Sequence, residues 1–197
     1  MHQYFEDNTD LKSEIKEVKV NIGNKTYTFK TDNGVFSKKG LDFGTRTLLE
    51  ALPINEIKGR VLDIGCGYGA IGIFVASNTE AVVDMTDINS RSLDLAKQNL
   101  VLNNVRANVQ YSNIYKDITD KYDYIITNPP IRVGKKVLYE ILFKAKEHLK
   151  DNGELWLVIN KDQGAKSLLK DMSETYEVSL ITKNKGFYII KAINRLT

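Results

Sequence analysis

Cysteine and histidine are scarce in this sequence of 197 residues, which contains one cysteine and two histidines. The single cysteine, Cys66, excludes an intrachain disulfide and any metal site built from several cysteines, and a small packed residue is its simplest role. His148 falls near the end of an expected helix, where a surface position facing the helix dipole is simpler than a catalytic one. We therefore expect no metal site.

Long apolar runs are also absent. The sequence has neither a segment long enough to cross a bilayer nor the apolar core of a secretory signal, and it has no internal repeat. Three prolines and 42% hydrophobic residues fit one compact core. We expect one domain over residues 1–197, with a cap of a hairpin and a helix in residues 1–58 and a core in residues 59–197, in a cytoplasmic protein that does not bind a membrane.

Two hydrophobic periods alternate along the chain. Residues 16–22 and 25–30 alternate polar with apolar around Gly23-Asn24, which predicts an antiparallel hairpin. The pattern further predicts strands at 60–64, 81–89, 122–128 and 153–160, helices at 45–51, 69–78, 137–149 and 162–172, and a last hairpin of 176–182 and 187–193. This order indicates an α/β fold, in which ligands bind at the carboxyl ends of the strands.

A glycine-rich turn follows the strand that ends at Ile64. The segment Val61–Ala70 reads Val-Leu-Asp-Ile-Gly-Cys-Gly-Tyr-Gly-Ala. Gly65, Gly67 and Gly69 lack a Cβ and tolerate unusual backbone angles, and the helix behind them presents unpaired N–H groups to a carboxylate or phosphate. The turn therefore predicts a site for an anionic or zwitterionic nucleoside.

The turn could bind either of two cofactors, a dinucleotide or S-adenosylmethionine. Gly65-x-Gly67-x-x-Ala70 fits the dinucleotide fingerprint, with Asp87 about 20 residues further on, so a dehydrogenase is one interpretation. Asp63 weighs against it, because a carboxylate just before the turn would repel a pyrophosphate but accept from a ligand ammonium. The last hairpin also weighs against it, since a nicotinamide-binding domain more often continues with parallel strands. We therefore favour S-adenosylmethionine.

A second motif, Asn128-Pro129-Pro130-Ile131, follows an apolar run typical of a strand buried on both faces. An exocyclic amine on a base is a poor nucleophile, because its lone pair is delocalised into the ring. The Asn128 side-chain oxygen and the Pro129 carbonyl can accept from its two N–H bonds, and such fixed dipoles stabilise the positive charge that develops on the nitrogen. Alone, Asn-Pro-Pro is an ordinary turn after a strand, but beside the glycine-rich turn it favours methyl transfer to nitrogen.

These motifs, in this order, resemble the class I S-adenosylmethionine-dependent methyltransferases. The resemblance implies a Rossmann-like, seven-stranded α/β fold with a C-terminal antiparallel hairpin, here with a small N-terminal β-hairpin cap. It implies that Asp87 bridges the ribose hydroxyls and that Asn113 accepts from the adenine amino group. The residues expected to contact the cofactor in this part of the chain are Asp63, Gly65, Gly67, Gly69, Asp87, Ile88, Asn113 and Asn128.

The segment 34–51 extends the resemblance to one group within these methyltransferases. Its order of Gly34-Val-Phe-Ser, Gly40-Leu-Asp and Gly44-Thr is similar to the region before the cofactor strand in the small-subunit ribosomal RNA guanine-N2 methyltransferases of the C type, here in a single-domain form. The resemblance implies that Phe36 and Ser37 line the cofactor and substrate pocket. It also implies that Asp42 and Thr45 help to hold the methionine end of the cofactor, although Thr45 could simply be a helix N-cap.

The implied activity is methyl transfer from S-adenosyl-L-methionine to N2 of a guanine in small-subunit ribosomal RNA. Asn128, Pro129, Pro130 and Ile131 would form the catalytic loop. Ile131 stands where adenine-directed enzymes usually have an aromatic residue to stack the base, so adenine methylation in DNA is less expected.

The expected partner is ribosomal RNA or the small ribosomal subunit. Arg132 and Lys135 adjoin the catalytic loop and are expected to contact the RNA. Longer relatives carry a second, degenerate copy of the domain, so a homodimer is possible here. Two alternatives stay open, which are a protein glutamine N5-methyltransferase with the same Asn-Pro-Pro motif and a non-catalytic protein that binds the cofactor or assists assembly.

Overall fold

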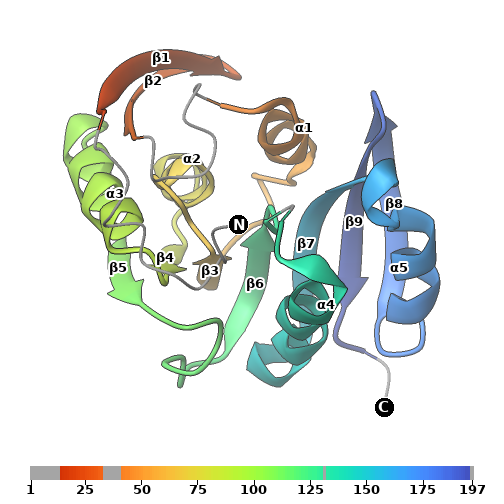
Figure 1. The fold of residues 1–197 in the computed structure, drawn as a ribbon. Coiled ribbons are helices and arrows are strands. Elements are labelled where there is room, and N and C mark those ends of the chain that lie inside the picture. Colours follow the sequence, from red (N-terminus) through yellow and green to blue (C-terminus); the bar gives the residue numbers. More distant parts are fainter. Residues whose placement is uncertain (1–13, 33–40, 131, 196–197) are drawn as a thin grey trace.

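A computed structural model describes residues 14–32, 41–130 and 132–195. Its main sheet has seven strands in the order β5-β4-β3-β6-β7-β9-β8, and a separate two-stranded sheet is formed by β1 and β2 (Figure 1). The predicted fold class is therefore confirmed, including both hairpins.

The centre of the sheet is parallel, and its C-terminal side is antiparallel. The strands are β3 (Arg60–Ile64), β4 (Val82–Asp87), β5 (Asn108–Tyr111), β6 (Tyr122–Thr127), β7 (Leu149–Asn160), β8 (Glu177–Asn184) and β9 (Phe187–Ile193). Strands β3 to β7 run parallel to one another, whereas β9 is antiparallel to both β7 and β8. The central strands are buried on both faces, which explains their continuous apolar runs.

Helices cover both faces of the sheet. They are α1 (Phe43–Ala51), α2 (Ala70–Asn78), α3 (Ser90–Leu102), α4 (Gly134–Lys144) and α5 (Ala165–Met172), with short 3₁₀ helices η2 (Ala145–His148) and η3 (Lys161–Gln163). One apolar cluster packs α1, α2 and α3 against the sheet, and a second packs α4 and α5. In Figure 1, α1 and α2 accordingly lie on the opposite side of the sheet from α4 and α5.

The N-terminal hairpin of β1 (Lys16–Ile22) and β2 (Lys25–Thr31) lies outside the layer of α2 and α3 (Figure 1). Asn99 of α3 and Asn103, the C-cap of that helix, bind the free edge of β2. Asn99 accepts from the Lys30 N–H at 2.7 Å and donates to the Lys30 carbonyl at 3.1 Å. Asn103, one turn later, makes the same pair of bonds with Thr28, both at 2.9 Å. These asparagines replace a neighbouring strand for β2.

Several predicted boundaries differ from the structure. The helix expected to reach Leu149 ends earlier, and Leu149 begins β7. The helix expected at 162–172 is interrupted at Gly164, whose φ of 80° breaks the helical path. The last hairpin has a two-residue turn, Lys185-Gly186, because both residues adopt positive φ angles of 48° and 84°.

The structure shows the environments of three individual residues, His148, Trp156 and Cys66. His148 is not simply a surface residue, because its ring stacks on Tyr115 with centroids 4.7 Å apart, and burial lowers its pKa. Trp156 is 3% exposed and lies in the core. Burial raises the pKa of the Cys66 thiol, consistent with a packed side chain rather than a nucleophile.

Within the described ranges, no helix is both long and apolar enough to span a membrane.

Candidate active site

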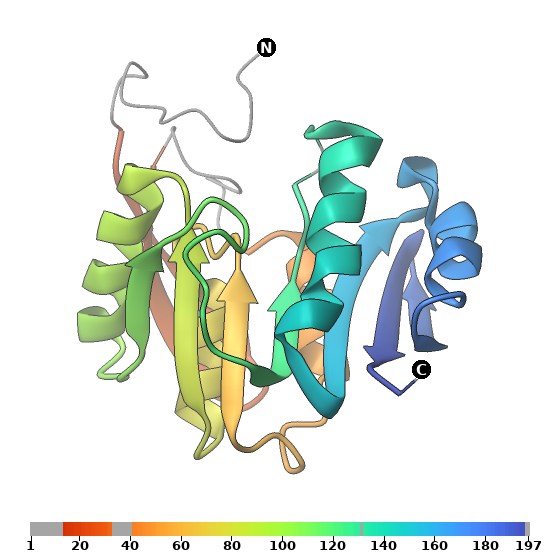
Figure 2. The same cartoon turned by 90° about the horizontal axis from the view of Figure 1, so that it is seen from below.

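The carboxyl ends of β3, β4 and β6 meet at one edge of the sheet, where the arrowheads point in Figure 2. The glycine-rich turn follows β3, Asp87 is the last residue of β4, and Asn128-Pro129-Pro130 follows β6. The fold therefore brings the two predicted motifs together, although more than sixty positions separate Ile64 from Thr127, whose hydroxyl donates to the Ile64 carbonyl at 3.1 Å. That bond joins the end of the strand before one motif to the end of the strand before the other.

The glycine-rich turn has the backbone that its sequence predicts. Gly65, Gly67 and Gly69 have φ angles of 67°, 55° and 102°, which residues with a Cβ rarely adopt. Helix α2 begins directly after Gly69 and has no side-chain N-cap. A hydrogen bond to β4 fixes the turn, because the Cys66 N–H donates to the Thr86 carbonyl at 2.9 Å.

Asp63 lies beneath this turn and is fully buried. Its Oδ2 accepts from the Gly72 N–H at 2.8 Å, whereas its Oδ1 has no hydrogen-bond partner. Burial raises its pKa to about 8, and the nearby charge of Asp87 adds to the shift. A buried acceptor without a donor is costly, and a cofactor ammonium or a bridging water would satisfy it.

Asp87 ends β4 and is 5% exposed. Its Oδ2 accepts from the Gly67 N–H and its Oδ1 from the Asn89 N–H, both at 2.9 Å. Burial raises its pKa, and these backbone N–H groups oppose the shift. These bonds show that Asp87 fixes the turn, and its contact with the ribose hydroxyls stays a prediction.

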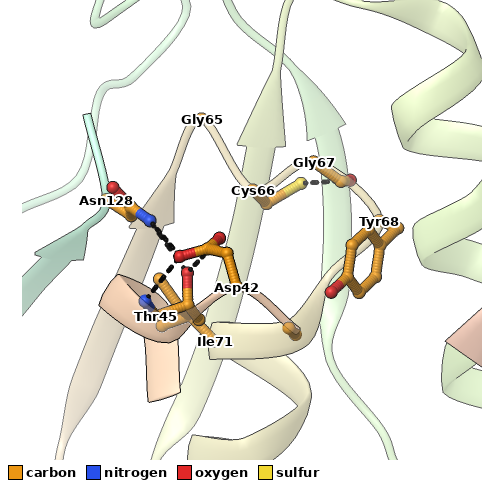
Figure 3. Close-up of a pocket in the computed structure, with 9 residues that line it drawn as sticks. Asp42, Thr45, Gly65, Cys66, Gly67, Tyr68, Ile71 and Asn128 are labelled. Atoms are coloured by element: carbon orange, nitrogen blue, oxygen red, sulfur yellow. Dashed lines mark hydrogen bonds between the residues drawn. The ribbon is translucent and has the colours of Figure 1, made fainter. Parts of the chain in front are cut away.

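A pocket opens between the glycine-rich turn, the start of α1 and the loop after β6 (Figure 3). Asp42, Thr45 and Asn128 form its polar side. Asp42, and not Thr45, is the N-cap of α1, because its Oδ1 accepts from the Thr45 N–H at 2.8 Å. The Thr45 hydroxyl donates to Asp42 Oδ2 at 3.0 Å and accepts from Asn128 Nδ2 at 2.8 Å. In Figure 3 the Asn128 nitrogen points toward this pair and its oxygen points away.

A second pocket lies on the other side of Gly65, where Asp87, Ser112 and Pro130 are among its lining residues. Ser112 is 3% exposed, and sequence analysis missed it because a serine after a strand carries no distinctive signal. Asn113, predicted to hold adenine, is the next residue and is half-buried, but it does not line this pocket. Tyr68, inside the glycine-rich turn, lines the first pocket and was also missed.

The remaining predicted residues fall into two groups. Phe36, Ser37 and Ile131 lie outside the described residues. Pro129 is buried and Ile88 is 9% exposed, whereas Arg132 is exposed, two residues after Pro130. Lys135 is exposed near the start of α4, with its Nζ 5.1 Å from the centre of the Tyr139 ring. In the part of the chain that the structure describes, no group of three or more His, Cys, Asp or Glu residues is placed to hold a metal ion.

Residues 26–191 match the methyltransferase small domain family. The chain belongs to this family. It is a class I methyltransferase that depends on S-adenosyl-L-methionine, which excludes the dehydrogenase interpretation. The left-handed glycines of the turn fit this cofactor, because they allow a ligand to approach the backbone closely. Asp63 lines neither of the two pockets described above, so its contact with the cofactor ammonium stays a prediction.

Two relatives and one solved structure are informative. The chain is 41% identical to the uncharacterized protein YbxB of Bacillus subtilis (strain 168), over 96% of each protein. It is 39% identical to the ribosomal RNA small subunit methyltransferase C of Haemophilus influenzae (strain 86-028NP), over 80% of this chain and 49% of that protein. A T. thermophilus 16S rRNA N2 G1207 methyltransferase, RsmC, solved with AdoMet and guanosine, superposes with a TM-score of 0.82 at 27% identity, over 92% of this chain and 51% of that chain. The chain thus spans about half the length of the methyltransferase C relatives that it matches.

Proposed function

We propose that this methyltransferase modifies the exocyclic N2 amine of a guanine in small-subunit ribosomal RNA. The observation that carries the proposal is the place of Asn128, which leaves β6 at the rim of the pocket formed by the glycine-rich turn, with its side-chain nitrogen bound and its oxygen directed elsewhere. The relation to a methyltransferase whose name specifies N2 of a 16S rRNA guanine supports the choice of acceptor.

Asn128 and Pro129 would polarise the reacting amine. S-adenosyl-L-methionine, when bound, supplies a methyl group on a positively charged sulfur. The Asn128 side-chain oxygen and the Pro129 carbonyl accept from the two N–H bonds of the amine, which localises its lone pair. Both acceptors are held by the protein before the reaction, so they stabilise the charge that develops on nitrogen more than they stabilise the ground state.

The cofactor would lie along the carboxyl edge of the sheet. Gly65, Gly67 and Gly69 allow the backbone to approach it, and Asp63 and Asp87 offer carboxylate oxygens below the turn. A guanine in a duplex cannot reach this edge, so the target must be unstacked or flipped out of its helix.

The direct test is methyl transfer with labelled S-adenosyl-L-methionine and small ribosomal subunits from cells that lack the gene. We expect label in N2-methylguanosine after digestion of the RNA. Label in a protein band would replace the proposal with glutamine methylation, and intact cofactor binding without any label would indicate a non-catalytic role.

Asn128→Ala tests the assigned chemistry. We expect turnover to fall by about 100-fold or more, because an acceptor that acts in the transition state is lost, while the cofactor Kd changes little. Steady-state kinetics and calorimetric binding measure the two effects, and Asn55→Ala, an exposed position before β3, is the control. A large rise in the cofactor Kd with unchanged turnover would assign Asn128 to cofactor binding instead.

A further inference from the structure

We propose that Thr45 and Asp42 are positioning residues that set the orientation of the Asn128 amide, so that its oxygen and not its nitrogen faces the reacting amine. The inference rests on the proposed role of Asn128 and adds the device that makes its side chain an acceptor. Residues 45 and 128 lie 83 positions apart and meet only in the folded protein.

The direction of each hydrogen bond in this network is determined by its donors and acceptors. A carboxylate can only accept, and Asp42 takes the N–H of Thr45 on Oδ1 at 2.8 Å and the hydroxyl of Thr45 on Oδ2 at 3.0 Å. The hydroxyl has one proton, and the charged carboxylate is a stronger acceptor for it than a neutral amide oxygen. Thr45 Oγ therefore faces Asn128 as an acceptor.

An acceptor at this position selects one of the two amide orientations. Asn128 Nδ2 donates to Thr45 Oγ at 2.8 Å and lies 3.5 Å from Asp42 Oδ1. Rotating the amide by half a turn would place its oxygen against two other oxygen acceptors. The same rotation would present an NH₂ group to the amine of the substrate, where two donors would meet. The network therefore favours the one orientation that can polarise the amine.

The surrounding elements hold this network in place. Thr45 is 6% exposed, so water competes little for its hydroxyl. Asp42 is held as the N-cap of α1. On the other side, Thr127 binds the Ile64 carbonyl at 3.1 Å and fixes the end of β6 immediately before Asn128. Both ends of the network are thus attached to regular elements.

The test compares Thr45→Val, which removes the hydroxyl, with Thr45→Ser, which keeps it. We expect Thr45→Val to lower kcat by about tenfold to 100-fold, as expected for a misplaced catalytic group, with little change in the KM for RNA or the Kd for the cofactor. Thr45→Ser should retain most of kcat. In an Asn128→Ala background, Thr45→Val should have almost no further effect, because the group that it positions is gone.

Thr47→Val is the matched control. Thr47 lies in the same helix and is 5% exposed, and its hydroxyl donates to the Phe43 carbonyl at 2.8 Å rather than to Asn128. If Thr47→Val lowers kcat as much as Thr45→Val, the effect comes from the helix and the proposal is wrong. A weaker cofactor Kd with unchanged kcat for Thr45→Val would also overturn it, by making Thr45 a cofactor ligand.

A second measurement is independent of the substrate. In the cofactor-free protein, the side-chain NH₂ signals of Asn128, identified by their loss in Asn128→Ala, should show slow hydrogen exchange in the wild type and in Thr45→Ser. They should exchange faster and shift in Thr45→Val. Unchanged signals in Thr45→Val would overturn the proposal whatever substrate the enzyme methylates, whereas a failure to label RNA would count only against the proposed function.

Discussion

At the scale of single residues, the carboxyl group of Asp63 links stability to pH. Its pKa rises from 3.8 to about 8 on folding, mainly because of burial. Between these pH values the folded state holds a proton on Asp63 that the unfolded state releases, so the contribution of Asp63 to stability is greatest at the acid end of this range and falls as pH rises toward about 8.

Asp63→Asn should remove this dependence. The amide keeps an acceptor for the Gly72 N–H but cannot ionise, so the unfolding free energy of the variant relative to the wild type should increase from about pH 4 to about pH 8 and then level off. Urea unfolding at a series of pH values measures the difference, with Asp151→Asn, an exposed carboxylate, as the control. Parallel curves for Asp63→Asn and the wild type would contradict the expected shift.

Sequence motifs located the residues of the site more reliably than they located its hydrogen bonds. Asp63, Asp87 and Asn128 all lie at the predicted edge of the sheet. Yet most of the oxygens of Asp63 and Asp87 bind backbone N–H groups, and the cap of α1 is Asp42 and not Thr45. Partners of this kind depend on loops that folding brings together, and no local pattern specifies them.

At the scale of secondary-structure elements, α3 is the support of the N-terminal hairpin. Asn99 is fully buried and binds both backbone groups of Lys30, and it also donates to the Tyr68 carbonyl in the glycine-rich turn at 2.8 Å. One side chain thus joins the hairpin, the helix and the cofactor turn. Asn103 makes two similar bonds to Thr28 but is only half-buried.

Alanine substitutions of these asparagines should have unequal effects. Asn99→Ala removes hydrogen bonds from three backbone groups, and the bond to the Tyr68 carbonyl is fully buried, so we expect the unfolding free energy to fall by about 2 kcal/mol or more. Asn103→Ala should cost about 1 kcal/mol or less, since water can reach the groups that it exposes. Chemical unfolding of both variants measures the difference, and equal losses would show that burial does not govern these bonds.

Elements with strictly local signals were predicted well. The turn Gly23-Asn24 and the apolar runs of β3 and β6 are local features, and their bounds agree closely with the structure. Helix α3 was not predicted, because the polar residue Asn99 interrupts its apolar stripe on the buried face. Helix ends were less accurate, because Leu149 is apolar in either element and only its pairing with Tyr122 makes it part of a strand.

At the scale of the whole molecule, the formal net charge of +3 is small, so RNA affinity depends on where the charges lie. Arg132 is exposed beside the Asn128-Pro129-Pro130 motif, whereas Lys58 is exposed before β3 at the opposite edge of the sheet. We expect Arg132→Ala to weaken binding of a ribosomal RNA fragment and to lower the slope of log K against log salt by about 1, because one phosphate contact is lost.

Filter binding over a range of salt concentrations measures that slope. Lys58→Ala should leave the slope unchanged, and an equal change in both variants would indicate general charge attraction rather than contact at the rim of the site.

The homodimer and the cytoplasmic location inferred from the sequence stay predictions.

The buried Trp156 is the only tryptophan of the chain. In β7 it pairs with Ile126 of β6, which lies two residues before Asn128 in the sequence. The Lys191 ammonium lies 5.9 Å from the centre of the Trp156 ring. All indole fluorescence of the protein therefore comes from one position next to β6, the strand that precedes Asn128. Movement of that strand when cofactor or RNA binds can be followed by the intrinsic emission of the unlabelled protein, without a second tryptophan to obscure it.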